Sequence, residues 1–178
     1  LLLAQRTFFV RGLVAQAEEA PPALRRELDR CRRRLGLRRP IGLRLSSQAT
    51  TTPAVCGLWR PVILIPQHLA ARLHGADLQA VLFHELAHVQ RGDLWINLAQ
   101  TLLQIVYFYH PLLWLANAAI RRIREKAVDE TVLVALGEVA WKYPETLVHV
   151  AKLALARRPT LSLRLIGVVE SKGALTSR

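Results

Sequence analysis

Methionine is absent from the 178-residue sequence, and cysteine occurs only twice. Cys31 and Cys56 make neither a disulfide framework nor the closely spaced pair of a zinc knuckle, which is compatible with a reducing compartment. A complete translation product starts with methionine whereas this sequence starts at Leu1, so we expect a piece of a longer protein. A cleavable signal peptide and internal repeats are also missing, and the length suits one domain with a hydrophobic core.

Acidic residues are scarce: 13 stand against 25 basic ones, and the net charge is +12. This balance leaves nucleic acid, an anionic membrane surface and acidic proteins open as partners. Hydrophobic residues make up 52% of the chain, which together with the basic charge favours a membrane surface. Residues 1–13 fit either the end of a membrane helix or a short amphipathic leader. We assign residues 1–20 to a juxtamembrane segment and residues 21–178 to one folded domain.

The apolar pattern predicts an α+β fold that is mostly helical. Residues 21–36 have one apolar helical face. A small sheet of about three strands follows, at residues 41–45, 53–59 and 61–66. The last of these is continuously apolar and β-branched, so we expect it to be central and buried. From Gln67 onward the chain is predicted to be helical.

Glycine and proline divide this helical part into separate helices. Gly92 is predicted to end one helix, and Asp93 is placed to cap the next. No charged residue occurs between residues 94 and 120, but Pro111 lies inside that run and should restart the helix. Gly137 is expected to end that helix, and Pro144 lies near the start of the last one.

The sequence VLFHELAHVQRGD, residues 81–93, holds two histidines and a glutamate on one predicted helix. Residues four apart share a helix face, so His84 and His88 can offer two imidazole nitrogens to one ion. Glu85 lies about 100° around the axis and suits a general base acting on water that the metal activates. Zinc lowers the pKa of bound water toward about 7, which is hydrolase chemistry. The alternative is a hydrogen-bonded core cluster, because burying these three side chains without partners is costly.

A catalytic zinc site needs a third protein ligand, and the candidate is Glu125 in IREKAVDE, residues 123–130. On one straight helix Glu125 would lie about 45 Å from the start of that helix near Asp93, too far to reach the motif. A turn at Pro111 instead makes an outward leg of about 24 Å and a return of about 21 Å. Zinc ligation and the proline therefore predict the same αα-hairpin.

Asp129 lies one helical turn beyond Glu125. A carboxylate there is predicted to accept the second N–H of a ligand histidine, which fixes the tautomer of the ring. The alternative is a salt bridge to Arg122 or Lys126.

The predicted hairpin tip is aromatic, with Tyr107, Phe108 and Tyr109 followed by Trp114 one turn on. Amphipathic aromatic residues collect at membrane interfaces, but each leg is too short to span a bilayer core of about 30 Å. The tip therefore either dips into a membrane or packs in a protein core. His110 lies more than about 20 Å from the metal site and is not expected to take part in catalysis.

The stretches HELAHVQRGDLWINLAQTLLQ and YFYHPLLWLANAAIRRIREKAVDE closely resemble the BlaR/MecR family of integral-membrane metallopeptidases. LRRPIGLRLSSQATTTPAVCGLWRPVILIP and SLRLIGVVESKGALTSR resemble the segments before and after these in that family, so that the resemblance covers roughly residues 24–178. It implies a gluzincin with a zincin-like domain and one Zn²⁺ per chain. By the resemblance, the site residues are His84, His88 and Glu125 as zinc ligands, Glu85 as general base, and Asp129 beside a ligand histidine. Val128 replaces the Cys or Ala of many relatives, and we expect no chemical consequence.

The resemblance also implies a place where substrate binds. The strand around residues 54–58 is expected to be an edge that pairs with an extended substrate backbone. Its candidate residues are Ala54, Val55, Cys56 and Gly57, with Thr50–Thr52 leading into the strand. The alternative is an ordinary capped edge strand.

For the whole protein, the resemblance implies a membrane-associated zinc-dependent endopeptidase at the cytoplasmic side of the bacterial inner membrane. The best-known members are β-lactam-sensing antirepressors, which cleave a transcriptional repressor, themselves or both. The expected partners are thus a protein substrate and membrane lipids. One alternative is a catalytically inactive zinc-binding signalling scaffold, against which the intact Glu85 argues. The other is a nucleic-acid-binding module on the Arg-rich helix at residues 24–39, which we do not expect, because helix-turn-helix and zinc-finger spacings and an aromatic stacking strip are missing.

Overall fold

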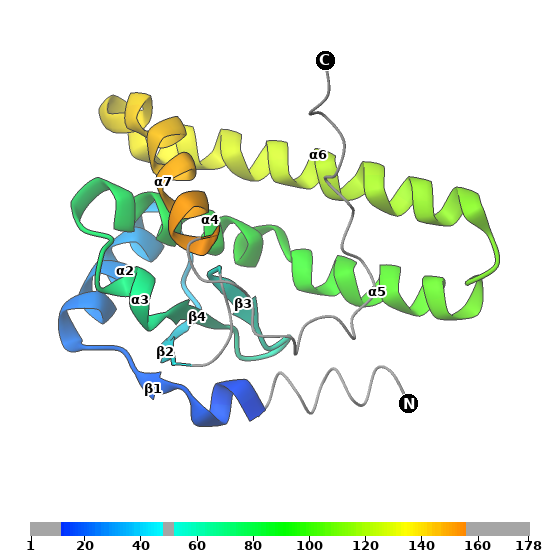
Figure 1. Ribbon diagram of the computed structural model, residues 1–178, viewed down its shortest axis with the longest axis horizontal. Coiled ribbons are helices and arrows are strands. Elements are labelled where there is room, and N and C mark those ends of the chain that lie inside the picture. Colours follow the sequence, from blue (N-terminus) through cyan, green and yellow to red (C-terminus); the bar gives the residue numbers. More distant parts are fainter. Residues whose placement is uncertain (1–11, 48–51, 156–178) are drawn as a thin grey trace, which may run out of the picture.

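The computed structural model describes residues 12–47 and 52–155 (Figure 1). The chain forms a mostly helical α+β fold with one small sheet, as the apolar pattern predicts. Most of the expected juxtamembrane segment, the loop residues Thr50 and Thr51, and the segment that begins SLRLIGVVE lie outside the described residues.

The sheet has four strands in the spatial order β1-β2-β4-β3. They are β1 (Glu18–Glu19), β2 (Gly42–Ser46), β3 (Ala54–Cys56) and β4 (Val62–Pro66). Parallel pairing joins β2 to β4, whereas β1 and β3 are antiparallel to their neighbours. The three predicted strands are confirmed, and β4 is central and buried. β1 was not predicted, since two exposed glutamates carry no alternating pattern.

Within the described residues β3 pairs with β4 alone, so it is an edge strand. A tight turn after Gly57 brings the chain back into β4. Gly57 has a φ of +87°, and a Cβ atom there would lie 2.5 Å from the carbonyl oxygen of Arg60. This turn therefore requires glycine, both for its backbone angle and for the space beside it.

The helices follow the predicted boundaries closely. They are α2 (Pro22–Arg34), α3 (Gln67–Ala70), α4 (Gly75–Arg91), α5 (Asp93–Val106), α6 (Pro111–Leu136) and α7 (Tyr143–Leu155), with a 3₁₀ helix, η1 (Gly137–Lys142), before α7. Gly92 ends α4 in a left-handed conformation with φ +71°. Of the helices named here from the described residues, η1 was not foreseen from the sequence.

The α4 helix is the centre of the hydrophobic core. Its residues Leu82, Phe83 and Leu86 are fully buried. It packs against α2 on one side and α6 on another, and it also contacts β3. From α6, Val128 and Val132 enter the same core. The helix that carries both histidines is therefore held rigidly by its apolar neighbours.

The predicted αα-hairpin is confirmed. α5 runs outward, the chain turns at residues 107–110, and α6 returns beside it (Figure 1). The return leg brings Glu125 back level with α4, as the helix lengths require. Across the described ranges, no helix combines the length and apolar character that crossing a membrane requires.

Candidate metal centre

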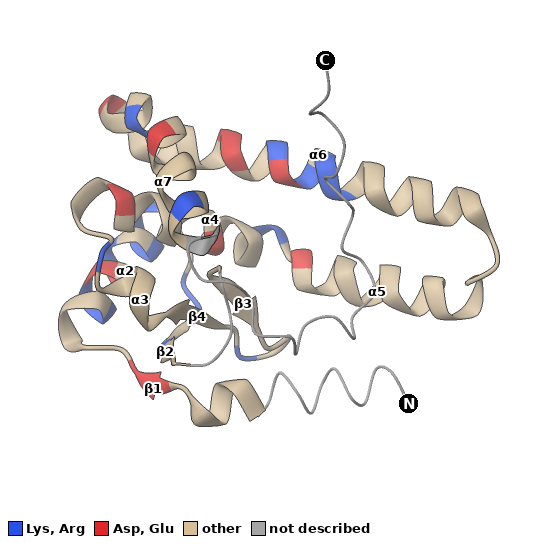
Figure 2. Cartoon of the chain, viewed as in Figure 1, with Lys and Arg blue, Asp and Glu red and all other residues tan. Residues whose placement is uncertain are grey.

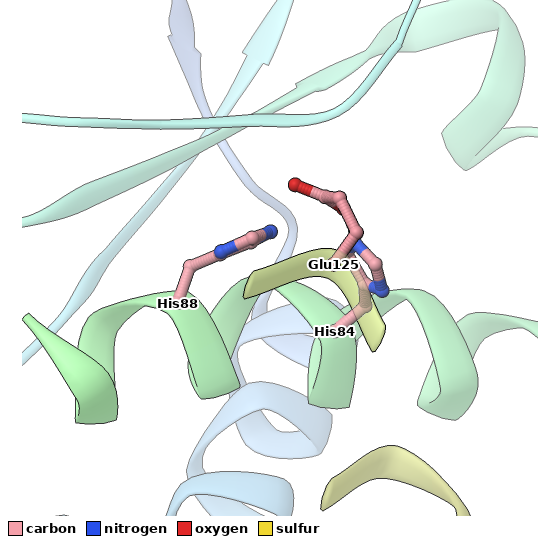
Figure 3. A group of neighbouring side chains, drawn as sticks. All are labelled: His84, His88 and Glu125. Carbon is pink, nitrogen blue, oxygen red and sulfur yellow. The ribbon is translucent and has the colours of Figure 1, made fainter. Parts of the chain in front are cut away.

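Three side chains from two helices meet at one point. His84 and His88 stand one turn apart on α4, and Glu125 reaches them from α6 (Figure 3). Their ligand atoms all lie within 4.8 Å of one another. The His84 Nε2 atom is 3.7 Å from Glu125 Oε2. Neighbouring ligands of a tetrahedral zinc ion are about 3.3 Å apart, so the side chains would move together by at most about 1.5 Å to close the site.

The other ring nitrogen of His84 faces Tyr143, the first residue of α7. The His84 Nδ1 atom is 3.1 Å from the Tyr143 hydroxyl oxygen, and this hydroxyl donates to Asp129 Oδ1 at 2.7 Å. Because the hydroxyl proton points to Asp129, the Nδ1–H of His84 donates to the hydroxyl oxygen. This tautomer leaves Nε2 free to face Glu125.

Asp129 is thus linked to His84 mainly through Tyr143, since the direct distance between Asp129 Oδ1 and His84 Nδ1 is 3.6 Å. Burial, and then the hydrogen bond to Asp129, raise the pKa of Tyr143 well above its usual range. The phenol therefore stays neutral and keeps its proton. The alternative, a salt bridge from Asp129 to Arg122 or Lys126, does not form among the residues that the structure describes.

His88 has a different partner. Its Nδ1 atom is 2.7 Å from Asp93 Oδ2, and Asp93 is only 2% exposed. The prediction that Asp93 caps α5 is wrong, because no side-chain capping bond forms there. The left-handed Gly92 ends α4 just before Asp93, and the carboxylate is used by His88 instead. Asp93 fixes the tautomer of His88, leaving its Nε2 for the site.

Asp93 is in turn held by Arg124, the residue before Glu125. The Arg124 guanidinium donates to the Asp93 carbonyl oxygen at 3.3 Å and to Asn97 Oδ1 at 2.7 Å. It also lies 3.9 Å from Asp93 Oδ1. Arg124 is buried, so this contact acts in a medium of low dielectric constant. This contact could not be predicted from local sequence, because it depends on how α5 and α6 pack in the hairpin.

Comparison with known proteins decides the family. The family model described as BlaR1 peptidase M56 matches residues 1–178. This chain belongs to the M56 family. The Regulatory protein BlaR1 of Bacillus licheniformis is 35% identical over 98 residues, which are 54% of this chain and 16% of that protein. The Methicillin resistance mecR1 protein of Staphylococcus aureus is 26% identical over 85 residues, which are 48% of this chain and 14% of that protein.

The resemblance to BlaR/MecR proteins drawn from the sequence is therefore confirmed. This M56 chain spans less than a fifth of the length of the curated relatives it matches. The family is one of peptidases.

In this M56 chain Glu85 lies against the three candidate ligands and is 7% exposed. Burial, and then the negative charge of Glu125, raise the pKa of Glu85 to about 8. Burial, and then the charge of His88, lower the pKa of His84. A neutral imidazole is the form that binds a metal ion.

A pocket of about 410 Å³ opens over these residues. Its walls come from β3, α4 and α7, and they include the apolar side chains of Leu147 and Val150. Of the predicted substrate-binding residues, Ala54 and Val55 line the pocket together with Thr52. Cys56, the last residue of β3, and Gly57, which follows the strand, do not line the pocket. His110 lies at the far end of the hairpin and is not among the lining residues.

The donor set suits zinc. Two imidazole nitrogens and one carboxylate oxygen are the ligands of many catalytic zinc sites, which keep a fourth position open. Here both Nδ1 atoms are engaged by Tyr143 and Asp93, so that the remaining donor atoms converge on one another and on the pocket.

Proposed function

We propose that this M56 family chain is the catalytic domain of a membrane-associated, zinc-dependent endopeptidase. The observation that carries the proposal is the convergence of His84, His88 and Glu125 beside Glu85 in one pocket. We assign this domain to residues 21–178.

The proposed mechanism needs one zinc ion per chain, bound by His84, His88 and Glu125. Bound there, zinc supplies a Lewis acid that activates water and polarises the peptide carbonyl. The positive charge of bound zinc would favour the carboxylate form of Glu85, which accepts a proton from the attacking water and passes it to the leaving amine. Tyr143 and Asp93 orient the two imidazole rings from outside the site.

We further propose that substrate binds as an extended strand along β3. Among the described residues β3 is paired on one side alone, and Ala54 and Val55 line the pocket. Both observations support the idea, because an edge strand offers backbone groups for pairing. Cys56 would continue the pairing to the end of the strand, and Gly57 would lie beside the substrate at the turn that follows. Such binding recognises mainly the backbone of the substrate, so it requires an unfolded stretch of polypeptide.

The proposed biological role is regulatory proteolysis of a repressor-like protein, of the enzyme itself, or of both. The name Regulatory protein BlaR1 given to one relative supports a regulatory role. We place the protein at the bacterial inner membrane with the catalytic domain on the cytoplasmic side. Its net charge of +12 supports contact with anionic lipids.

Metal content tests the proposal directly. We expect mass spectrometry of the purified wild-type chain to find about one zinc per molecule, since three protein ligands suffice for a catalytic site. Glu125→Ala and His84→Ala should lose most of that zinc while keeping their helical circular dichroism. Equal zinc in all three proteins, or none in a folded wild type at neutral pH without chelator, would contradict the site.

Glu85→Gln separates the peptidase from a catalytically inactive zinc-binding scaffold. We expect the variant to keep its zinc, because Glu85 is not a ligand, and to lose at least about a hundredfold in cleavage rate. Cleavage of the chain itself can be followed by mass spectrometry after reconstitution with zinc. A catalytically inactive scaffold would show the same zinc content and the same absence of cleavage with and without this substitution.

A further inference from the structure

The hairpin of α5 and α6 is apolar on its outside. We call the exposed apolar side chains between residues 102 and 120 the hairpin surface. Among its members, Val106, Phe108, Leu112 and Leu115 each expose between 62% and 69% of their area. A water-soluble hairpin would turn these side chains inward, because burying them is the main stabilising force in water.

The inside of the hairpin is polar. Between the two helices the buried side chains include Gln100, Asn117 and Arg124. Gln100 donates to Asn117 Oδ1 at 3.0 Å and accepts from Arg124 at 3.2 Å. The hairpin is therefore inverted relative to a soluble protein. Polar side chains that face one another while apolar ones face outward are the arrangement found in lipid.

A sharp boundary of charge marks the base of the hairpin. No Asp, Glu, Lys or Arg lies between Asp93 and Arg121, so the outer half of the hairpin carries none of these side chains (Figure 2). Arg121 and Arg122 are both exposed at the base. Nearby, Trp59 and Trp95 form an edge-to-face pair with ring centroids 5.1 Å apart. Exposed tryptophan and arginine at one level are typical of the headgroup region of a membrane.

We propose that the hairpin surface enters the apolar core of a lipid bilayer from one side, with Arg121, Arg122 and the Trp59–Trp95 pair at the headgroups. The 14 residues of α5 rise about 21 Å, which is less than the core thickness of about 30 Å. The hairpin thus dips in and returns. This deepens the membrane part of the proposed function and is independent of the metal chemistry.

The position of the metal centre then follows. Glu125 lies four residues after Arg121, which is about 6 Å along α6. The pocket therefore opens close to the headgroups, and the favoured substrates are polypeptides that are held at the membrane surface.

Vesicle flotation tests the proposal with the full chain loaded with zinc. We expect it to float with vesicles of phosphatidylcholine and phosphatidylglycerol. Phe108→Asp combined with Leu115→Asp should lower the bound fraction at least about tenfold, because a charge in the bilayer core is unfavourable. Both positions are exposed to solvent, so the protein should still fold. Val134→Asp is the matched control: this α6 residue is 83% exposed but lies outside the hairpin surface, and its substitution should leave flotation unchanged.

Two arms distinguish insertion from surface attraction. Arg121→Gln with Arg122→Gln should weaken binding to anionic vesicles about fivefold per charge and leave binding to neutral vesicles unchanged. A variant that keeps Trp114 alone should be quenched by lipids brominated on their acyl chains more strongly than one that keeps Trp59 alone. Equal or reversed quenching would overturn insertion.

Other outcomes also overturn the proposal. Folded wild type that stays in the aqueous fraction, or a double aspartate variant that floats like wild type, excludes the bilayer as the partner of this surface. Wild type that does not bind vesicles but sediments as a dimer, together with a monomeric double aspartate variant, would show that a second copy of the chain covers the surface instead. Zinc content is measured on every variant, so a failed metal site is recognised separately from a failed membrane contact.

Discussion

His84 and His88 present the same ring nitrogen to the site but are held by different groups. His88 donates to the carboxylate of Asp93, whereas His84 donates to the neutral phenol of Tyr143. A carboxylate is the stronger acceptor because the bond is assisted by its charge. The two supports should therefore differ in their effect on metal affinity.

We expect Asp93→Asn to weaken zinc affinity by about 10-fold to 100-fold. The amide keeps the shape of the side chain but removes the negative charge that faces His88 and Arg124. Tyr143→Phe should lower zinc affinity by less than about tenfold. Asp129 Oδ1 is only 3.6 Å from His84 Nδ1 and can shift to accept its N–H directly. Competition with a chromophoric chelator measures both, and Tyr107→Phe at the exposed hairpin tip is the control. A larger loss in Tyr143→Phe would reverse the proposed ranking.

Cys31 makes the stability of the protein depend on pH. It is 1% exposed, and burial, followed by the charge of Glu27, raises the pKa of its thiol to about 12. The unfolded chain loses this proton near pH 9.0. The contribution of the protonated thiol to folding stability is therefore complete below pH 9 and is lost as the pH rises toward 12. Between pH 8 and pH 10 the free energy of unfolding of wild type should fall by about 1.4 kcal/mol more than that of Cys31→Ala. Urea unfolding at both pH values measures this difference, and an unchanged difference would mean that the buried thiol ionises as easily as in water.

Sequence reasoning found the residues whose spacing is local. His84, Glu85 and His88 lie within two turns of one helix, and Glu125 followed from the length of a hairpin. Asp93 was recognised but given the wrong role, because the spacing does not show whether its carboxylate caps α5 or turns back to His88. Tyr143 was missed, since its contact with His84 spans 59 residues and depends on how α7 docks.

At the scale of elements, the edge strand β3 depends on the turn that follows it. Gly36 and Gly57 both have positive φ angles, but a Cβ atom meets nothing within 4 Å at Gly36 and meets the Arg60 carbonyl at Gly57. Gly36→Ala should lower the free energy of unfolding by about 1 kcal/mol. Gly57→Ala should cost about 3 kcal/mol, because the backbone must also shift. Urea denaturation compares the two, and similar losses would show that the turn adapts freely.

The elements themselves were largely predictable. Pro111, together with the need for Glu125 to return to the histidines, predicted the hairpin, and the apolar pattern located β2, β4 and α4. β1 and η1 were not predictable, because short elements of two and six residues are set by tertiary packing and not by periodicity. Nor did the pattern reveal that the hairpin is polar inside, since that depends on which faces of α5 and α6 meet.

At the scale of the whole molecule, a bound zinc ion would join α4 to α6. A ligand at about a thousand times its dissociation constant stabilises the folded state by about 4.1 kcal/mol. For a chain of 178 residues this corresponds to a rise in melting temperature of roughly 8–16 °C. Thermal unfolding with zinc and with EDTA measures the difference. Glu125→Ala should show little of it, and an equal shift in that variant would place the stabilising ion elsewhere.

The α6 helix acts mechanically as a lever. Val128 and Val132 fix its second half in the core, while its first half, from Pro111, projects into the hairpin. With the fulcrum at Val128, Glu125 sits on an arm of about 4.5 Å and the tip on an arm of about 25 Å. A swing of the tip therefore reaches Glu125 at about one sixth of its amplitude. Tip movements below about 3 Å leave the ligand within the roughly 0.5 Å that a preorganised site tolerates, so the centre is shielded from small fluctuations of its surroundings and disturbed only by large ones.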